Sequence, residues 1–447
     1  MILKIKNKLR KDVALHELIS GGAISFFMQG FGMLSGYILM ALIANYFGTR
    51  ILGIYSLSYT ILTLGIILST VGMDMVILKI AGKRENVSSI STLKKIYSIV
   101  IPITAIFTCA LIAVSFQYLN SFFDETEYKQ YLIITGISIM FSAIFTINIE
   151  YLRAEGNISI SEFLRNILRP LMSIVLIVAT CLLYYDTYIP GYTLLTSSLF
   201  ACVFSIYLVF WRYRTNGAYA SASGCKETLK TLVGSGLPMQ VSMLAFYMIS
   251  NMVVFFIEGY ENSISVGLML VSIKLAGLIN MPLMVLNKVC APRFSKLYWA
   301  NQYKELQDYL GQVTKLAFYA AVIAGMFLVV FSEYVLSVFG NDFIQAKNIL
   351  FILVLGQLVS CASGSVGIFM MMTGHERAYR NIAVIVALLS FVAYYLVVPV
   401  YGVVGAAYVL ACSQAVLNIV SVIYIKYRVG FITMFLPFGS QFLLHKL

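Results

Sequence analysis

The stretch SVGLMLVSIKLAGLINMPLMVLN, residues 265–287, contains 23 residues and a single charge, Lys274. A helix needs about 20 consecutive apolar residues to cross the roughly 30 Å hydrocarbon core of a bilayer. This stretch therefore predicts a membrane-spanning helix with one lysine inside it. The fold class then depends on how many similar stretches the chain contains.

Eleven further apolar stretches occur along the 447 residues: 19–47, 51–73, 97–119, 131–149, 168–185, 191–211, 233–257, 314–332, 348–372, 382–399 and 403–425. The composition agrees, since 60% of the residues are hydrophobic and 11% are charged, with a mean hydropathy of +0.89. An average soluble domain is about 45–50% apolar and about 25% charged. We therefore predict an all-α polytopic membrane protein with about twelve spans. This excludes a cytosolic enzyme, a secreted disulfide scaffold and a free nucleic-acid-binding protein.

The 31 lysines and arginines are distributed unevenly between the two sides of these spans. If the amino terminus is cytoplasmic, 27 of them lie on the cytoplasmic side, including Arg165 and Arg169 after the fourth span. Lys274 lies within a span, and three lie outside: Arg50, Lys129 and Lys347. Cytoplasmic loops of membrane proteins carry an excess of lysine and arginine. We therefore expect both termini in the cytoplasm, and the net charge of +12 reflects this asymmetry rather than nucleic-acid binding.

The chain divides into two halves of similar rhythm. Residues 216–224, rich in Gly, Ser and Ala, separate six spans from six, and a shift of 214 residues aligns Gly22 with Gly236, Tyr46 with Tyr260 and Gly53 with Gly267. An even number of spans in each half predicts a parallel repeat about an axis along the membrane normal. We predict an N-terminal six-helix bundle, residues 1–225, and a C-terminal six-helix bundle, residues 226–447, that face a central cavity.

Motifs for catalysis or for ATP hydrolysis are not found in the sequence. There is no Gly-x-x-x-x-Gly-Lys-Ser/Thr loop, and the three histidines (His16, His375 and His445) are far apart without metal-ligand spacing. The seven cysteines are scattered and imply no disulfide framework. We expect no catalytic residue, no metal site and no cofactor, so the sequence indicates a transporter without its own ATPase.

Lys274 is the most informative candidate residue. It lies about nine residues, or roughly 14 Å, into its span, and a lysine near the bilayer centre costs roughly 2.5–3.5 kcal/mol. Two interpretations stay open: an anion-binding lysine of a transport cavity, or a structural lysine bonded to a neighbouring helix. No Asp or Glu lies in the middle of a span. The only deeply buried charge is therefore expected to be positive, which favours an anionic substrate.

Four further candidates lie at the ends of spans: Arg50, Asp74, Lys79 and Arg153. Asp74 and Lys79 are five residues apart and either form a local ion pair or border the inner mouth of the cavity. Arg153 follows the fourth span, and Arg50 lies on the outer side. For Asp74, Lys79 and Arg153, anchoring at the membrane surface is the simpler interpretation, and contact with the substrate is the alternative. Arg50 is either an ordinary loop residue, which is the simpler interpretation, or a residue that takes part in release of the substrate.

Several short motifs occur in a fixed order along these spans: SGG at 20–22, LGIY at 52–55, GMD at 72–74, YLRAEGN at 151–157, APRFS at 291–295, FGNDF at 339–343 and MTGHE at 372–376. In order and spacing they resemble the polysaccharide branch of the MOP exporter superfamily, the Wzx-type oligosaccharide flippases. The resemblance covers nearly the whole chain and implies a MOP/MATE-like pair of six-helix bundles around a cationic lumen.

The resemblance also implies a function. Members of this family move undecaprenyl-pyrophosphate-linked oligosaccharides across the bacterial cytoplasmic membrane for O-antigen, capsule or exopolysaccharide synthesis, and polymerase and chain-length proteins are the expected partners. Lys274 is then expected to hold the pyrophosphate, with Arg50, Asp74, Lys79 and Arg153 as further substrate-binding candidates. A multidrug and toxin extruder shares the twelve-span plan and is the alternative. The absence of a buried acid disfavours it, since such an antiporter needs a carboxylate for its coupling ion.

Overall fold

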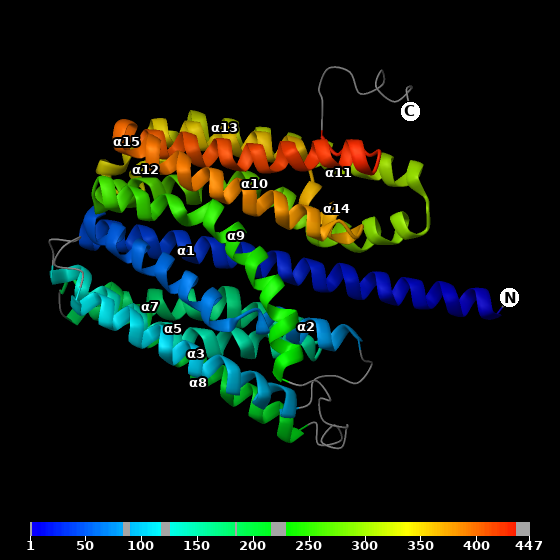
Figure 1. Ribbon diagram of the computed structural model, residues 1–447, viewed down its shortest axis with the longest axis horizontal. Coiled ribbons are helices and arrows are strands. Elements are labelled where there is room, and N and C mark those ends of the chain that lie inside the picture. Colours follow the sequence, from blue (N-terminus) through cyan, green and yellow to red (C-terminus); the bar gives the residue numbers. More distant parts are fainter. Residues whose placement is uncertain (1, 84–89, 118–125, 184–185, 216–228, 435–447) are drawn as a thin grey trace. The chain divides into compact units, whose positions relative to one another are not determined.

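A computed structural model describes residues 2–83, 90–117, 126–183, 186–215 and 229–434 (Figure 1). These ranges contain helices and turns and no strand. Ten of the helices within them are long and apolar enough to cross a membrane. Two of the ten, with 44 and 53 residues, contain a glycine with non-helical dihedrals, Gly48 and Gly402, and each is long enough for two passes of about 20 residues. The prediction of an all-α polytopic protein with about twelve spans is confirmed.

The described chain divides into two compact units, Met1–Leu244 and Ala245–Leu447. The predicted domain boundary between residues 225 and 226 falls within 216–228, outside the described residues. The exact division of the halves therefore stays a prediction.

Unit 1 is built around the helix α5. Its elements are α1 (Ile2–Thr70), α2 (Met73–Lys83), α3 (Ile90–Gln117), α5 (Thr126–Ala154), α6 (Ile158–Phe163), the π-helix η1 (Leu164–Leu168), α7 (Arg169–Leu183), α8 (Ile189–Thr215) and the first part of α9 (Leu229–Tyr260). α5 packs against α1, α2, α3 and α8 (Figure 1). Apolar side chains from these helices, among them Ile96, Ile147 and Leu152, are fully buried at the core of the unit.

A sharp break after Thr70 starts α2. Val71 and Gly72 both have positive φ, 50° and 72°. A Cβ atom on Gly72 would lie 2.4 Å from the carbonyl oxygen of Gly236 on α9, so this position needs glycine both for its backbone and for space. The side chain of Gln240 donates a hydrogen bond to the carbonyl oxygen of Ile67. These contacts fix where α2 begins.

Unit 2 contains the last part of α9 and α10 (Ser263–Trp299), α11 (Tyr303–Val330), α12 (Ser332–Ser337), the 3₁₀ helix η3 (Asn341–Ala346), α13 (Lys347–Ser363), α14 (Val366–Met372) and α15 (Glu376–Arg428). α13 packs against α10, α11 and α15. Asn262 caps α10 by accepting the Ser265 N–H at 2.9 Å. Glu261 accepts the N–H of Val403, beside the break at Gly402, at 3.2 Å.

The 214-residue shift that aligns the two halves in sequence also relates one interruption of the helices in unit 1 to one in unit 2, but not the next. Gly48, where α1 bends, lies 214 residues before Asn262, the cap of α10, which is the shift that aligns the halves in sequence. The break at Val71 and Gly72 has no counterpart in unit 2, because α10 continues without interruption to Trp299. Unit 1 therefore gains a separate short helix, α2, whose first turn carries Asp74.

Candidate functional site

Lys274 lies near the middle of a candidate span that extends from Ser263 to Asn287, about 16 Å from one end and about 20 Å from the other at 1.5 Å per residue. Its side chain is exposed on unit 2. Leu270 and Val271, one turn before it on α10, are buried in the unit. Lys274 is therefore an exposed position within a stretch of α10 that is otherwise buried or half-buried. A lysine facing lipid at this depth is costly, so this position suits water or a polar substrate.

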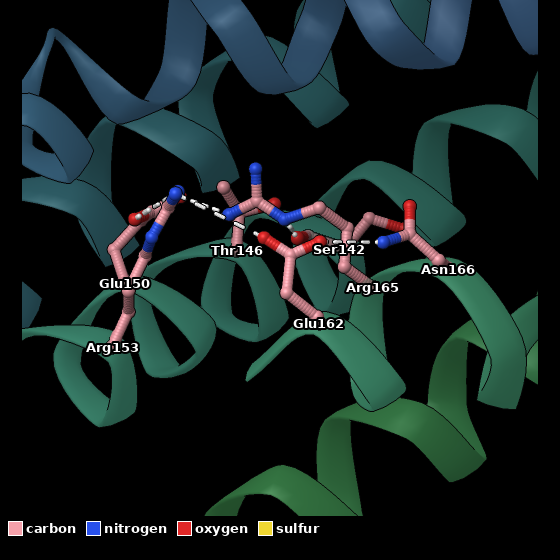
Figure 2. A network of polar contacts seen from close by, with 7 residues as sticks. All are labelled: Ser142, Thr146, Glu150, Arg153, Glu162, Arg165 and Asn166. Atoms are coloured by element: carbon pink, nitrogen blue, oxygen red, sulfur yellow. Dashed lines mark hydrogen bonds and ion pairs between the residues drawn. The ribbon is translucent and has the colours of Figure 1, made fainter. Parts of the chain in front are cut away.

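A network of charged residues links α5 to the segment that follows it in unit 1 (Figure 2). Arg165 donates to one oxygen of Glu150. The Arg153 guanidinium lies 3.9 Å from both Glu150 and Glu162, and Asn166 donates to Glu162 at 2.7 Å. The carboxylates are buried, with 6% of Glu150 and 4% of Glu162 exposed. Two arginines therefore compensate the charge of Glu150, and one arginine and one amide donor compensate that of Glu162.

The turn between α5 and α6 brings these residues together. Gly156 has φ +85°, and the N–H of Asn157 donates to the Leu152 carbonyl at 3.1 Å. Arg212 on α8 donates to the Asn157 side chain. Burial raises the pKa of the Glu155 carboxyl at this turn, and a hydrogen bond from Tyr151 partly offsets the effect. The reversal places the end of α5 beside η1, so residues 15 positions apart in sequence form an ion pair.

Asp74 at the start of α2 borders this network. It is 9% exposed, and its Oδ1 atom has no hydrogen-bond partner among the described residues. Burial raises its pKa, and the negative charge of Glu150 acts in the same direction, whereas the Met75 N–H and Arg165 lower it. The side chain of Lys79 is outside the described residues, so the predicted Asp74–Lys79 pair stays a prediction.

One sequence prediction about charge is wrong. The only deeply buried charge was expected to be positive, yet three carboxylates, Asp74, Glu150 and Glu162, are buried in unit 1. They lie toward the ends of the apolar stretches, where sequence position suggested contact with water. For Glu150 and Glu162, the turn at Gly156 instead brings arginines close enough to act as counter-ions. The argument against a drug extruder from a missing buried acid therefore no longer holds.

Arg50 behaves as an exposed ion pair. Its guanidinium lies 3.1 Å from the carboxylate of Glu127 at the start of α5, and 47% of the Arg50 side chain is exposed. Such pairs contribute at most about 1 kcal/mol. The geometry favours the interpretation of Arg50 as an anchor between α1 and α5, and its contact with substrate stays a prediction.

Arg169 is the charged residue whose environment the sequence prediction missed. It was expected in a cytoplasmic loop, but it lies within the candidate span Ser159–Cys181, about 15 Å from one end and about 18 Å from the other. Its side chain donates to Ser198 Oγ on α8 at 3.1 Å, and its guanidinium carbon lies 5.7 Å from the centre of the Tyr59 ring. None of the ion pairs between described residues includes Arg169.

The backbone before Arg169 is irregular for identifiable reasons. Pro170 has no N–H, so the α-helical bond to the Asn166 carbonyl cannot form, and the chain is π-helical over Leu164–Leu168. α1 approaches this segment closely at Gly32, where a Cβ atom would lie 2.6 Å from the Asn166 oxygen. Such π-helical turns are frequent at functional sites. An Arg-Pro pair inside an apolar stretch was the signal in the sequence that could have identified this position.

Comparison with protein families identifies the chain. The sequence profile of a family described as polysaccharide biosynthesis protein matches residues 52–348. The chain belongs to this family. The family resemblance inferred from the motifs is thereby confirmed. No curated protein sequence matches the chain.

Solved structures with a similar fold are MOP-superfamily transporters. The lipid II flippase MurJ in an inward closed conformation gives a TM-score of 0.68 at 16% identity, over 91% of this chain and 87% of that chain. A MOP superfamily transporter from Pyrococcus furiosus gives 0.66 at 15% identity, over 92% and 95%. An inward-facing multidrug resistance MATE family transporter gives 0.65 at 16% identity, over 91% and 94%. At these identities the similarity shows the fold alone.

Proposed function

We propose that this polysaccharide biosynthesis protein is a flippase that moves undecaprenyl-pyrophosphate-linked oligosaccharides across the bacterial cytoplasmic membrane, with both termini in the cytoplasm. The translocated units would serve a surface polysaccharide such as O-antigen, capsule or exopolysaccharide. Polymerase and chain-length proteins, which act on the same lipid-linked units, are the expected partners. The family match over residues 52–348 supports a role in glycan assembly, and the transporter fold supports translocation rather than sugar transfer.

The observation that carries this proposal is the placement of Lys274. A lysine in mid-span and exposed on its unit suits an anionic head group that must cross the membrane, because an opposite charge offsets the cost of keeping the ammonium away from bulk water. We therefore propose Lys274 as a contact of the pyrophosphate. Arg153 already forms ion pairs with two carboxylates, and Arg50 forms one with a single carboxylate. Their roles in substrate binding, with those of Asp74 and Lys79, stay predictions.

Complementation tests the proposal. Cells depleted of the native protein receive the wild type, Lys274→Ala or Lys274→Arg, and surface polysaccharide and membrane abundance are measured for each. We expect wild-type rescue, failure of Lys274→Ala at normal abundance, and partial rescue by Lys274→Arg. A wild-type copy that restores no glycan contradicts the flippase proposal. If alanine works as well as lysine, the assignment of Lys274 is wrong and the flippase proposal stands.

A multidrug extruder is the second candidate, and the buried carboxylates of unit 1 favour it more than the sequence did. The acids Glu150 and Glu162 are ion-paired with arginine, which makes them poor sites for a cationic drug. The same cells separate the two functions: a wild-type copy that raises resistance to cationic drugs and restores no glycan supports the extruder.

A further inference from the structure

We propose that Arg169 is an anion-binding residue of unit 1 and that its ligand is a phosphate group of the lipid-linked substrate. The identity of the ligand rests on the proposed function. The binding of an anion rests on the surroundings of Arg169 itself, which differ from those of Arg153 and Arg165 in the charged network.

The first step is that Arg169 has no counter-ion among the described residues. Arg169 lies in the middle of a membrane-spanning segment, yet it forms none of the ion pairs found among the described residues. Its partners there are a serine hydroxyl and a tyrosine ring, both uncharged. Ionisable residues within membrane segments face a partner charge or a water-filled path, and they mark substrate pathways. The positive charge of Arg169 is therefore left for a ligand.

The second step is donor capacity. A guanidinium has five N–H donors in a planar fork that matches the oxygens of phosphate. Among the described residues, one of these donors is used, by Ser198 Oγ at 3.1 Å. The Ser198 hydroxyl donates in turn to the Leu194 carbonyl at 2.6 Å, so its oxygen is oriented to accept from Arg169. One edge of the fork is thus held by α8, and the other N–H groups have the geometry to bind a second acceptor.

The third step is access and rigidity. Arg169 is half-buried, and Tyr59, whose ring its guanidinium contacts, is 43% exposed. A ligand that reaches the Tyr59 ring therefore also reaches the guanidinium. The backbone behind Arg169 is fixed by Pro170 and by the close contact of Gly32 with Asn166. The site combines an accessible charge with a rigid support, which favours binding over a purely structural role.

Binding to purified protein in nanodiscs tests the proposal. Affinities are measured for undecaprenyl pyrophosphate, for uncharged undecaprenol and for soluble glucuronate, which carries the carboxylate of an acidic sugar. We expect Arg169→Gln to weaken undecaprenyl pyrophosphate binding at least tenfold and to leave undecaprenol binding unchanged. Arg169→Lys keeps the charge without the fork and should lose two- to fivefold. Lys347→Gln, which removes an exposed cation paired with Glu333, is the control and should bind as the wild type does.

Several outcomes overturn the proposal. If Arg169→Gln binds undecaprenyl pyrophosphate as tightly as the wild type does, Arg169 does not belong to the site. If Arg169→Gln loses as much affinity for undecaprenol as for undecaprenyl pyrophosphate, the role of Arg169 is structural. If Arg169→Gln weakens the binding of glucuronate but not that of undecaprenyl pyrophosphate, the site binds the sugar instead. If Arg169→Gln does not fold, the Arg169→Lys arm decides, since affinity equal to wild type contradicts the role of the fork. If lipid binding depends on Arg169 but the wild-type protein restores no glycan in cells, the proposed function is wrong and the anion site at Arg169 stands.

Discussion

Arg165 and Arg169 lie one helical turn apart in the same membrane-spanning segment, but they have opposite electrostatic environments. Arg165 is bonded to the buried carboxylate of Glu150, which Arg153 also approaches. Among the described residues, Arg169 donates to the Ser198 hydroxyl and lies beside the Tyr59 ring, and it forms no ion pair there. The first arginine belongs to a closed network that holds α5 against η1. The second keeps its charge available, so the presence of a counter-ion, rather than depth in the membrane, separates a structural cation from a binding cation.

The largest expected effect concerns the closed network. Glu150→Leu leaves Arg165 without its main partner and Arg153 with only Glu162, and breaking a buried pair from one side costs about 3–5 kcal/mol. Because Arg165 is 40% exposed, we expect about 2–3 kcal/mol of destabilisation after discounting for solvent screening. The free energy of unfolding, measured by denaturant titration in detergent, checks this value.

The double variant Glu150→Leu with Arg165→Met is the control for that prediction. Replacing both partners by apolar side chains of similar size is often neutral, so we expect stability within about 1 kcal/mol of the wild type. A double variant as unstable as the single one would contradict the Glu150–Arg165 ion pair as the cause of the destabilisation.

The next effect concerns the support behind Arg169. Gly32→Ala places a Cβ atom 2.6 Å from the backbone oxygen of Asn166, and overpacking of this kind costs about 1–3 kcal/mol. At Gly36, one turn later in α1, a Cβ atom would have no neighbour within 4 Å, so Gly36→Ala is the matched control. Thermal unfolding should separate the two variants. Equal melting temperatures would contradict the close approach of α1 to η1.

A smaller effect depends on pH. The folded-state pKa of Asp74 is raised, mainly by burial, so its contribution to stability is fully present below the ordinary value of 3.8 and is lost as the pH rises through the raised pKa. Asp74→Asn removes this loss. We expect the variant to match the wild type at acidic pH and to be about 1 kcal/mol more stable at neutral pH. A constant difference across the pH range would contradict the burial of an ionised Asp74.

The smallest effect concerns Ser198. Ser198→Ala removes the hydroxyl that orients the Arg169 fork, and a single hydrogen bond of this kind contributes about 1 kcal/mol. We expect a two- to fivefold loss of undecaprenyl pyrophosphate affinity with an unchanged melting temperature. An unchanged affinity would indicate that Arg169 does not need α8 for its orientation.

The sequence predicted the fold better than it predicted the site. Each apolar stretch, and the side on which each lysine or arginine lies, can be read from the local sequence alone. About twelve spans could therefore be counted before any packing was known. The environment of a charge depends on which helices meet. Glu150 and Glu162 are buried, and nothing in their sequence position indicates that burial. Arg169 was placed in a loop because the apolar run begins beside it, at residue 168, whereas the helical segment begins ten residues before that run, at Ile158.

Translocation in proteoliposomes tests the central claim most directly. A fluorescent undecaprenyl-pyrophosphate-linked oligosaccharide is placed in the outer leaflet, and its rate of loss to the inner leaflet is followed by quenching from outside. We expect the wild type and the Glu150→Leu, Arg165→Met double variant to translocate at similar rates and Arg169→Gln to be at least tenfold slower. Arg169→Gln liposomes as fast as the wild type, or wild-type liposomes no faster than protein-free ones, would contradict the account.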